Sequence, residues 1–587
     1  MARWFGCSIF VLALVACGPS GRNNHGPCSG SAMQCVGNEL ETCQDGTFQD
    51  SMTCPNACSD MLGCVLCVPG TGTCNGNIST ACNADGSGYD MVTCDPVEGV
   101  TCDQTMGVCT GTCSPAALSQ SYIGCDYYPT VTGNIVGDNF DFAVAISNTS
   151  GDVAMITIDG GALTSPMMVT VPANSLLVQK LPWQQALKMC NDALTPETGG
   201  CDDIAPTEPG IVAKGAYHLR SNNPVTVYQF NSLEYSIDGG VDFSYSNDAS
   251  LMLPTNVWRK DYFAAALGGL AGVNPSEMAI TAMQDGTMVT IKSRATTDAA
   301  PGIQAFAIGT PQTIMLNQGD VVELTSNGDP AEVDVTDYDF TGSEITSSAP
   351  VQVISGHYCA DVPDDPPVAA CDHMEESMFG VDALSSTYIV NAPAVTTEPA
   401  GKVEVIRVIA TQPGTTLTYN PAQPGAPTTI TNAGDFIAIE NNSASFMITA
   451  NQKVMVAQYM EGQDADGAGT GDPAMALAVP VEQFRTSYLF HAPISYDSNY
   501  VDVTAPTGAT VMLDGMPVTF NAIGATGYSL GRVNPLTAGP NGDGSHNITG
   551  DMPFGITVYG YGQYTSYWYA GGLDLSTIVI AREGPTK

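Results

Sequence analysis

Apolar and polar residues alternate in short runs along most of the chain. A period of two is typical of strands with one buried face, and it is clear at residues 140–146 (FDFAVAI) and 154–158 (AMITI). Gly, Pro, Asn and Asp separate the runs and favour turns. A helical period is found at 183–189 (WQQALKM), where we expect one short helix. The pattern predicts an all-β fold from about residue 126 onward.

One strand pattern recurs four times. The copies are SNNPVTVYQF (221–230), SAPVQVIS (348–355), ANQKVMVAQY (450–459) and DMPFGITVYGY (551–561). The spacings from Pro224 to Pro350, Lys453 and Pro553 are 126, 103 and 100 residues. A unit of about 100 residues with six or seven short strands has the size of a β-sandwich, whereas a propeller blade usually has four strands in about half that length.

These spacings predict four tandem antiparallel β repeats. Sandwich-like units are favoured, and a closed propeller-like ring of four large blades is the alternative. Each repeat is expected to end in an aromatic strand, and the first three such strands are at 262–265, 388–393 and 488–493. The expected boundaries are about 126–270, 271–395, 396–495 and 496–587.

Charge excludes one class of partner. Acidic residues outnumber basic ones 59 to 17, and the net charge is −42. Nucleic acid requires a basic surface, so we expect no nucleic-acid binding.

The N-terminus indicates export. Arg3 precedes an apolar run that extends to Ala16, which is too short to cross a bilayer as a helix and fits a signal peptide. The run ends in LVAC (14–17), which resembles the lipobox of bacterial lipoproteins. The resemblance implies a signal peptide at 1–16, a lipidated tether at 17–27 and acylation, including palmitate, at Cys17. Gly18 stands where an inner-membrane retention signal has Asp, which favours the outer membrane.

Twelve cysteines lie within 28–109 in two copies of one pattern, and we expect the cysteine-rich region to extend to residue 113. The first copy starts at Cys28 and the second at Cys67, 39 residues later. In an exported chain such density predicts a disulfide framework with three bridges per module. Zinc is the alternative, because Cys64 and Cys67 have ligand-like spacing. The spacing leaves the connectivity open.

Six further cysteines fall into three local pairs. These are Cys113 with Cys125, Cys190 with Cys201, and Cys359 with Cys371. The third pair brackets a proline-rich loop beside His357 and His373, within SGHYC and CDHMEE. Free thiols beside these histidines would suit zinc. A bridge would make the segment a structural finger, and the oxidising compartment favours the bridge.

Calcium is a second metal candidate. Asp464, Asp466 and Asp472 alternate with glycines and small residues, and alternate carboxylates can chelate a hard cation. The spacing does not fit an EF-hand, since Ala468 and Met475 occupy its fifth and twelfth positions. A plain turn is favoured, so no cofactor is expected.

Three segments resemble the N-terminal domain of the IgGFc-binding protein family. They are SNNPVTVYQF, NDASLMLPTNVWRKDYFAA (247–265) and the SGHYC–CDHMEE pair, and the likeness covers about 130–500. The resemblance implies an extracellular, non-catalytic binding or matrix protein. It does not imply antibody binding by this chain.

Together these features predict a cell-surface lipoprotein that acts in adhesion or ligand binding and is not an enzyme. It would be held on the outer membrane by its N-terminal lipid and face the exterior. An extracellular protein or glycan would be its ligand. The alternatives are a matrix component that assembles with itself through exposed strand edges and a secreted hydrolase.

Overall fold

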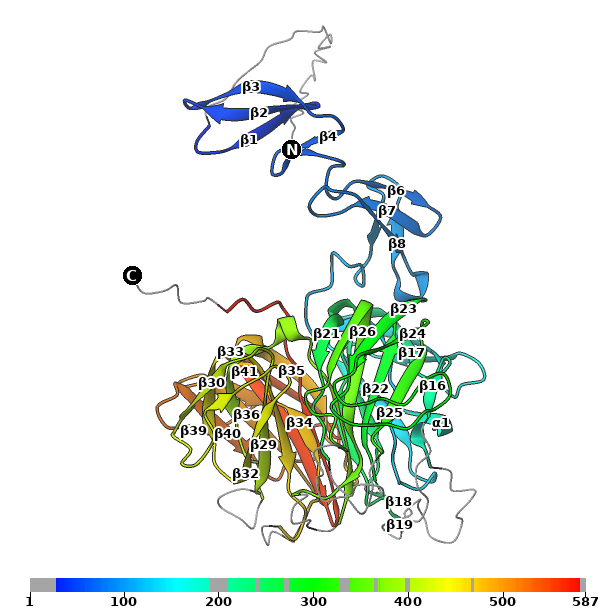
Figure 1. Cartoon of the computed structure of the whole chain (residues 1–587), viewed down its shortest axis with the longest axis vertical. Coiled ribbons are helices and arrows are strands. Elements are labelled where there is room, and N and C mark those ends of the chain that lie inside the picture. Colours follow the sequence, from blue (N-terminus) through cyan, green and yellow to red (C-terminus); the bar gives the residue numbers. More distant parts are fainter. Residues whose placement is uncertain are drawn as a thin grey trace, which may run out of the picture. The chain divides into compact units, whose positions relative to one another are not determined.

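The computed structural model describes most of the chain. The described residues are 28–190, 209–237, 240, 242–268, 274–327, 338–363, 368, 370–395, 402–465 and 469–580. They form two units (Figure 1). The first contains residues up to 94 together with 101–109, and the second contains 95–100 and everything from 110 onward.

The first unit consists of two small disulfide-linked modules. The first module has the sheet β1–β2–β3 and the hairpin β4–β5, and the second has β6–β7–β8 and β9–β10. The strands are Met33–Val36, Glu39–Gln44, Thr47–Thr53, Ala57–Ser59, Gly63–Val65, Gly72–Asn75, Ile78–Cys82, Tyr89–Thr93, Thr101–Asp103 and Val108–Thr110.

Both modules have the same disulfide connectivity, in which the first cysteine pairs with the third, the second with the fifth and the fourth with the sixth. The bridges are Cys28–Cys43, Cys35–Cys58 and Cys54–Cys64, then Cys67–Cys82, Cys74–Cys102 and Cys94–Cys109. The zinc alternative for Cys64 and Cys67 is therefore wrong, because each sulfur is already bound in the bridge of its own module. The disulfide-rich N-terminal region is confirmed.

The second unit contains four large antiparallel sheets, each built around one long strand. These strands are β17 (Tyr217–Asn231), β26 (Glu344–Ala360), β33 (Phe446–Met460) and β41 (Ser545–Gly562). They carry the four recurring segments found in the sequence. The all-β fold is confirmed, and the expected helix is α1 (Gln185–Lys188).

The four sheets share one strand order. The first is β14-β13-β17-β12-β15, the second β24-β23-β26-β22-β25-β16, the third β31-β30-β33-β29-β32 and the fourth β38-β37-β41-β36-β40-β39. Two more strands also pair with each long strand: β11 and β20, β21 and β27, β28 and β34, and β35 and β42.

The strand bounds of the first two sheets are as follows. The first has β11 Gly124–Tyr127, β12 Phe142–Asn148, β13 Ala154–Gly160, β14 Met167–Val171, β15 Ser175–Leu181 and β20 Asp248–Leu251. The second has β16 Gly210–Val212, β21 Arg259–Phe263, β22 Ser276–Ala282, β23 Thr287–Lys292, β24 Gln312–Leu316, β25 Val321–Thr325 and β27 Asp372–Ser377. A small hairpin, β18 Ser236–Ile237 with β19 Asp242–Phe243, lies between β17 and β20 in the sequence.

The other two sheets follow in the C-terminal half. The third has β28 Ser385–Val390, β29 Glu404–Ala410, β30 Thr415–Asn420, β31 Thr429–Ile430, β32 Phe436–Asn442 and β34 Met475–Leu477. The fourth has β35 Arg485–His491, β36 Ser498–Pro506, β37 Val511–Leu513, β38 Met516–Pro517, β39 Phe520–Ala522, β40 Tyr528–Val533 and β42 Thr565–Ala570.

Each long strand changes partners near its middle. In β26, residues up to Val351 pair with β21 and β23, and residues from Val351 onward pair with β22 and β27. The ladder to β21 is irregular at this change, and Pro350 lies there. Proline cannot donate to a ladder and is tolerated where pairing is interrupted. The recurring proline therefore marks the point where the strand passes from one set of neighbours to the other.

A buried tyrosine fixes this change of partners in every sheet. Its hydroxyl donates to the main-chain oxygen of the residue that follows the recurring proline or lysine, and it accepts the main-chain N–H three residues before itself. The tyrosine and acceptor pairs are Tyr127–Val225, Tyr262–Val351, Tyr388–Val454 and Tyr488–Phe554. The N–H donors are Gly124, Arg259, Ser385 and Arg485.

The contacts of these tyrosines show that the strands carrying them belong to a different sheet from the one expected from the sequence. The sequence placed the strands of Tyr262, Tyr388 and Tyr488 at the ends of repeats. Instead β21, β28 and β35 pair with the following long strands β26, β33 and β41. The physical reason is the hydroxyl contact, which requires the tyrosine strand to lie beside the next long strand in the sequence.

The four sheets meet through the short strands that follow the long ones. β20 contacts β27 and β42, and β34 contacts the same two strands, so the four form a closed cycle of contacts. One hydrophobic core includes residues of all four long strands, among them Val227, Val353, Met455 and Val558. The region where β20, β27, β34 and β42 meet is called the four-sheet junction below.

Candidate functional site

The histidine and cysteine segment leads directly into the four-sheet junction. Cys359 at the end of β26 is bonded to Cys371 just before β27, with 5.1 Å between the Cα atoms. Sulfurs in a disulfide are not thiolate ligands, so these cysteines do not supply a zinc site. The bridge closes the loop between two paired strands and fixes the point where β27 enters the junction.

His357 and His373 are fully buried. The His357 ring accepts the main-chain N–H of Cys359 through Nδ1 at 3.2 Å. The His373 ring lies between two carboxylates, with Nδ1 3.7 Å from Oε1 of Glu277 and Nε2 3.7 Å from Oε2 of Glu375. Both histidines are therefore part of the interior, out of reach of a macromolecular ligand.

Glu375 is held by polar side chains of the first sheet and its flanking segment. Its carboxylate accepts bonds from Thr132 Oγ1 at 2.8 Å and from Gln229 Nε2 at 2.8 and 3.0 Å. Burial raises the pKa of the neighbouring Glu277 well above its usual value, and the charges of Glu323 and Glu375 raise it further. The protonated form of Glu277 is therefore favoured in the fold.

Asp248 connects all four sheets. Oδ1 accepts the main-chain N–H of Ala249 in its own strand at 2.9 Å and that of Trp568 in β42 at 3.0 Å. Oδ2 accepts those of Glu375 in β27 at 3.2 Å and Met475 in β34 at 3.1 Å. One side chain thus bonds to a main-chain N–H in each of β20, β27, β34 and β42. Burial raises its pKa well above the usual value, against the effect of these bonds.

Asp372 makes a second set of links at the junction. It accepts the main-chain N–H of Asn247 at 2.6 Å, that of Ser566 at 3.1 Å and the hydroxyl of Thr565 at 3.0 Å. Burial again raises the pKa, with a further contribution from Asp472. These carboxylates join strands that are far apart in the sequence.

The calcium candidates do not come together as a cation site. Asp472 is buried, accepts the main-chain N–H of Gln463 at 3.0 Å and donates its own N–H to Ser566 Oγ at 2.8 Å. Asp464 is exposed, and Asp466 lies outside the described residues. Within the described ranges, no group of three or more His, Cys, Asp or Glu side chains is arranged to hold a metal ion.

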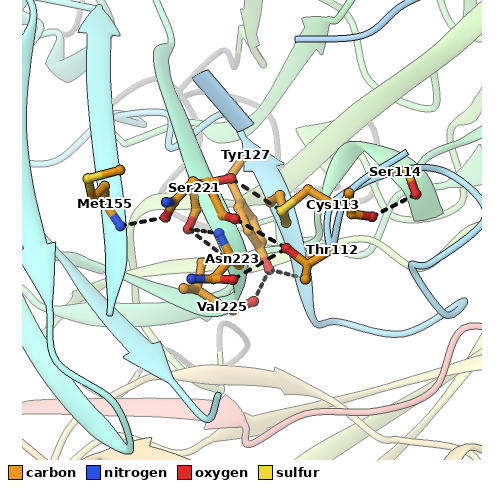
Figure 2. The surroundings of a disulfide bond; sticks show 12 residues. Thr112, Cys113, Ser114, Tyr127, Met155, Ser221, Asn223 and Val225 are labelled. Carbon is orange, nitrogen blue, oxygen red and sulfur yellow. Dashed lines mark hydrogen bonds between the residues drawn. A yellow bond between two sulfur atoms is a disulfide. The ribbon is translucent and has the colours of Figure 1, made fainter. Parts of the chain in front are cut away.

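The Cys113–Cys125 disulfide lies against the first long strand, as Figure 2 shows. Cys113 Sγ is 3.3 Å from the main-chain oxygen of Ser221, and Thr112 Oγ1 donates to Asn222 O at 3.2 Å. Tyr127, which bonds to Val225, is in the same view. The bridge ties the segment before β11 to β11 itself, which pairs with β17, and the Thr112 bond adds a direct link to β17.

The described residues include only one of the three other cysteines for which the sequence predicts a role. Cys190 takes part in a disulfide, whereas Cys201, its expected partner, lies outside the described residues. Cys17 also lies outside them. No described helix has the length and apolar character needed to span a membrane.

Described residues of the second unit line two hollows at its surface. The larger has a volume of about 510 Å³ and lies between β15 and the connection from β35 to β36, with Val178, Leu233 and Ile494 among its walls. The smaller, of about 270 Å³, is lined by residues of the third sheet and Arg294. The sequence indicated neither hollow, because the walls of each come from segments far apart in the chain.

The polar junction, the disulfides and the outward hollows define a class of protein: an all-β, disulfide-bonded scaffold whose chemically versatile side chains are interior. A family model described as IgGFc binding protein matches residues 248–560, more than half of the chain. The chain belongs to the IgGFc-binding protein family. The match starts and ends later than the stretch of about 130–500 expected from the sequence.

A human relative agrees with this membership. The chain is 24% identical over 348 residues to the human IgGFc-binding protein. The aligned part is 58% of this chain and 6% of the human protein. This chain therefore matches only a small part of that relative.

Proposed function

We propose that the protein is an extracellular, non-catalytic binding protein that holds a protein or glycan ligand on its outer surface. The observation that carries this proposal is the burial of His373 and of Asp248, Asp372 and Glu375, whose carboxylates bond to other sheets. Family membership supports the same function, since the name of the human relative describes binding of an antibody fragment. Loops on a rigid β scaffold commonly carry recognition.

The test combines binding with turnover. The chain from Cys28 onward is applied to arrays of extracellular glycoproteins and glycans, and size-exclusion chromatography measures its oligomeric state. Saturable binding by a monomer supports the proposal. Concentration-dependent self-association without ligand binding would favour the matrix alternative, and turnover on a glycan or peptide panel would favour a hydrolase.

We also propose that a lipid on Cys17 anchors the protein to the outer face of a bacterial outer membrane. The lipobox-like LVAC at 14–17 supports this anchor, and acyl chains on one cysteine are strong membrane signals. Twelve disulfide-bonded cysteines follow within 28–109, which is consistent with export.

Mass spectrometry of the N-terminal peptide tests the anchor after expression of the full chain in a Gram-negative host. We expect acylation at Cys17 in the wild type and in Cys7→Ser, which changes a cysteine within the signal segment. Cys17→Ser should lose both the lipid and the membrane fraction. A wild-type peptide that begins elsewhere, or that carries no acyl group, would contradict the proposal.

A further inference from the structure

The outer strand β15 offers main-chain groups for pairing. β15 (Ser175–Leu181) is paired with β12 on one side, and in the described part of the chain no strand pairs with its other side. An edge strand presents unpaired N–H and C=O groups, which can template an added strand. Most of β15 is half-buried, and Lys180 is exposed.

The larger hollow is lined in part by three residues of β15 and is called the edge groove. Its walls include Val178 and Lys180 of β15, Leu233 and Glu234 after β17, and His491 and Ile494 near the end of β35. Ile494 is 60% exposed. Tyr235 N donates to Ser495 Oγ at 3.3 Å and fixes one wall against the other. The lining is mainly apolar, so an apolar side chain would gain from entering it.

The charges beside the groove favour a basic partner. Lys180 Nζ is 2.6 Å from Asp141 Oδ2 and 2.5 Å from Glu234 Oε1, which leaves two carboxylates around one ammonium. Burial lowers the pKa of His491 to about 4, so its ring is neutral near pH 7. The net charge of −42 opposes the approach of a second copy of the chain.

We propose that an extended, basic segment of a partner protein adds to β15 as a further strand and inserts an apolar side chain into the edge groove. This inference rests on the proposed binding function and assigns it a surface. Main-chain hydrogen bonds to β15 supply the affinity. The groove accepts apolar side chains at every second position of the added strand, and this gives specificity. Asp141 and Glu234 select a lysine or arginine next to them. The seven residues of β15 offer about 23 Å of edge.

The first experiment measures anisotropy of a labelled nine-residue peptide that alternates valine with threonine and lysine, titrated with the chain from Cys28 onward. Binding is expected, with slower hydrogen exchange in residues 175–181. N-methylation at alternate residues removes the N–H groups along one edge of the peptide. A peptide methylated on the edge that faces β15 cannot pair, so it should bind at least about tenfold more weakly, a loss of about 1.4 kcal/mol in binding free energy. Equal binding of the methylated peptide overturns strand addition. Equal binding of a peptide with glutamate for lysine overturns the charge argument.

Two matched variants locate the surface. Ile494→Asp places a charge in the groove and should weaken binding at least about tenfold. Met168→Asp changes a residue that is 75% exposed on β14, the opposite edge of the same sheet, and should leave binding within about twofold. Equal losses in both variants would overturn the assignment.

The same variants separate this inference from the proposed function. If a ligand retained from the arrays is held equally by the wild type and by Ile494→Asp, the groove assignment fails while the binding function stands. If neither protein retains any ligand or peptide, both fail. Loss of the array ligand in Ile494→Asp, but not in Met168→Asp, supports both.

Discussion

Replacing Asp248 by alanine removes a side chain that bonds to main-chain N–H groups in all four sheets. The wild-type carboxylate accepts N–H groups from Ala249, Glu375, Met475 and Trp568 at 2.9–3.2 Å. Alanine accepts none of them, and these groups lie in a junction where Asp248 itself is fully buried. We therefore expect Asp248→Ala to destabilise the second unit strongly.

The magnitude follows from the three donors that belong to other strands. Leaving one buried donor unsatisfied costs about 1–3 kcal/mol. Three such donors give roughly 3–9 kcal/mol, and partial relaxation together with the removal of a buried carboxyl places the expected loss at about 4–6 kcal/mol. This is a large part of the roughly 5–15 kcal/mol that stabilises a typical domain. Asp248→Asn keeps one acceptor oxygen and should lose about half as much.

Urea unfolding followed by tryptophan fluorescence measures these losses, since Trp568 is at the junction and donates directly to Asp248. Asp551→Ala is the matched control, because Asp551 is exposed and accepts one main-chain bond, from Thr510 N at 2.8 Å. It should change the free energy of unfolding by less than about 1 kcal/mol. If Asp248→Ala is no more destabilised than Asp551→Ala, the junction does not hold the sheets together in the way described.

Three further outcomes are expected. Burial raises the pKa of Glu404 to about 8 and that of Asp472 to about 7, so the folded chain holds these protons more tightly, and stability should fall as the pH rises from about 4 to about 8. The urea midpoint should depend less steeply on pH in Glu404→Gln than in the wild type. A wild-type midpoint that increases over this pH range would contradict the raised pKa values of these two carboxyls. Replacing Cys359 and Cys371 by serine opens a bridge of sequence separation 12 and should cost about 2–4 kcal/mol. A peptide map without that bridge would reject its structural role. Tyr388→Phe removes the hydroxyl between Ser385 N and Val454 O and should cost about 1–3 kcal/mol in urea unfolding, and a variant as stable as the wild type would exclude that role.

The long strands could be predicted from the sequence because their apolar alternation is local. The run after Pro350 has a clear period of two and a turn before it, and it forms the central part of β26. The twelve N-terminal cysteines were equally informative, because density and repetition predict bridges within each module. Their connectivity required the structure, since spacing alone does not determine which cysteines meet.

The junction could not be predicted, because its polarity contradicts the pattern that indicates burial. The sequence Asp372–Ser377 (DHMEES) is polar at five of six positions, yet every one of its residues is buried. Its burial depends on Asp248, Met475 and Trp568, which come from other strands more than ninety residues away. A ligand-rich segment and a buried polar junction look alike in the sequence until these partners are known.

The tyrosine strands show a similar limit. The sequence identified the strands of Tyr262, Tyr388 and Tyr488 but assigned them to the preceding repeat. Their partners are decided by a hydroxyl bond to the next long strand, which has no local signature. The spacing from the tyrosine to its acceptor is 98, 89, 66 and 66 residues in the four sheets, so no constant interval in the sequence indicates the pairing.

The central claim is that the protein binds its ligand at the surface and leaves it chemically unchanged. The most direct measurement is intact-mass analysis of ligands eluted from the chain after long incubation, compared with the same ligands incubated alone. The account predicts retained ligands with unaltered mass. Cleaved or modified products that appear with the wild type and disappear with His373→Gln or Glu375→Gln, both still folded, would contradict it by showing that the interior residues are catalytic.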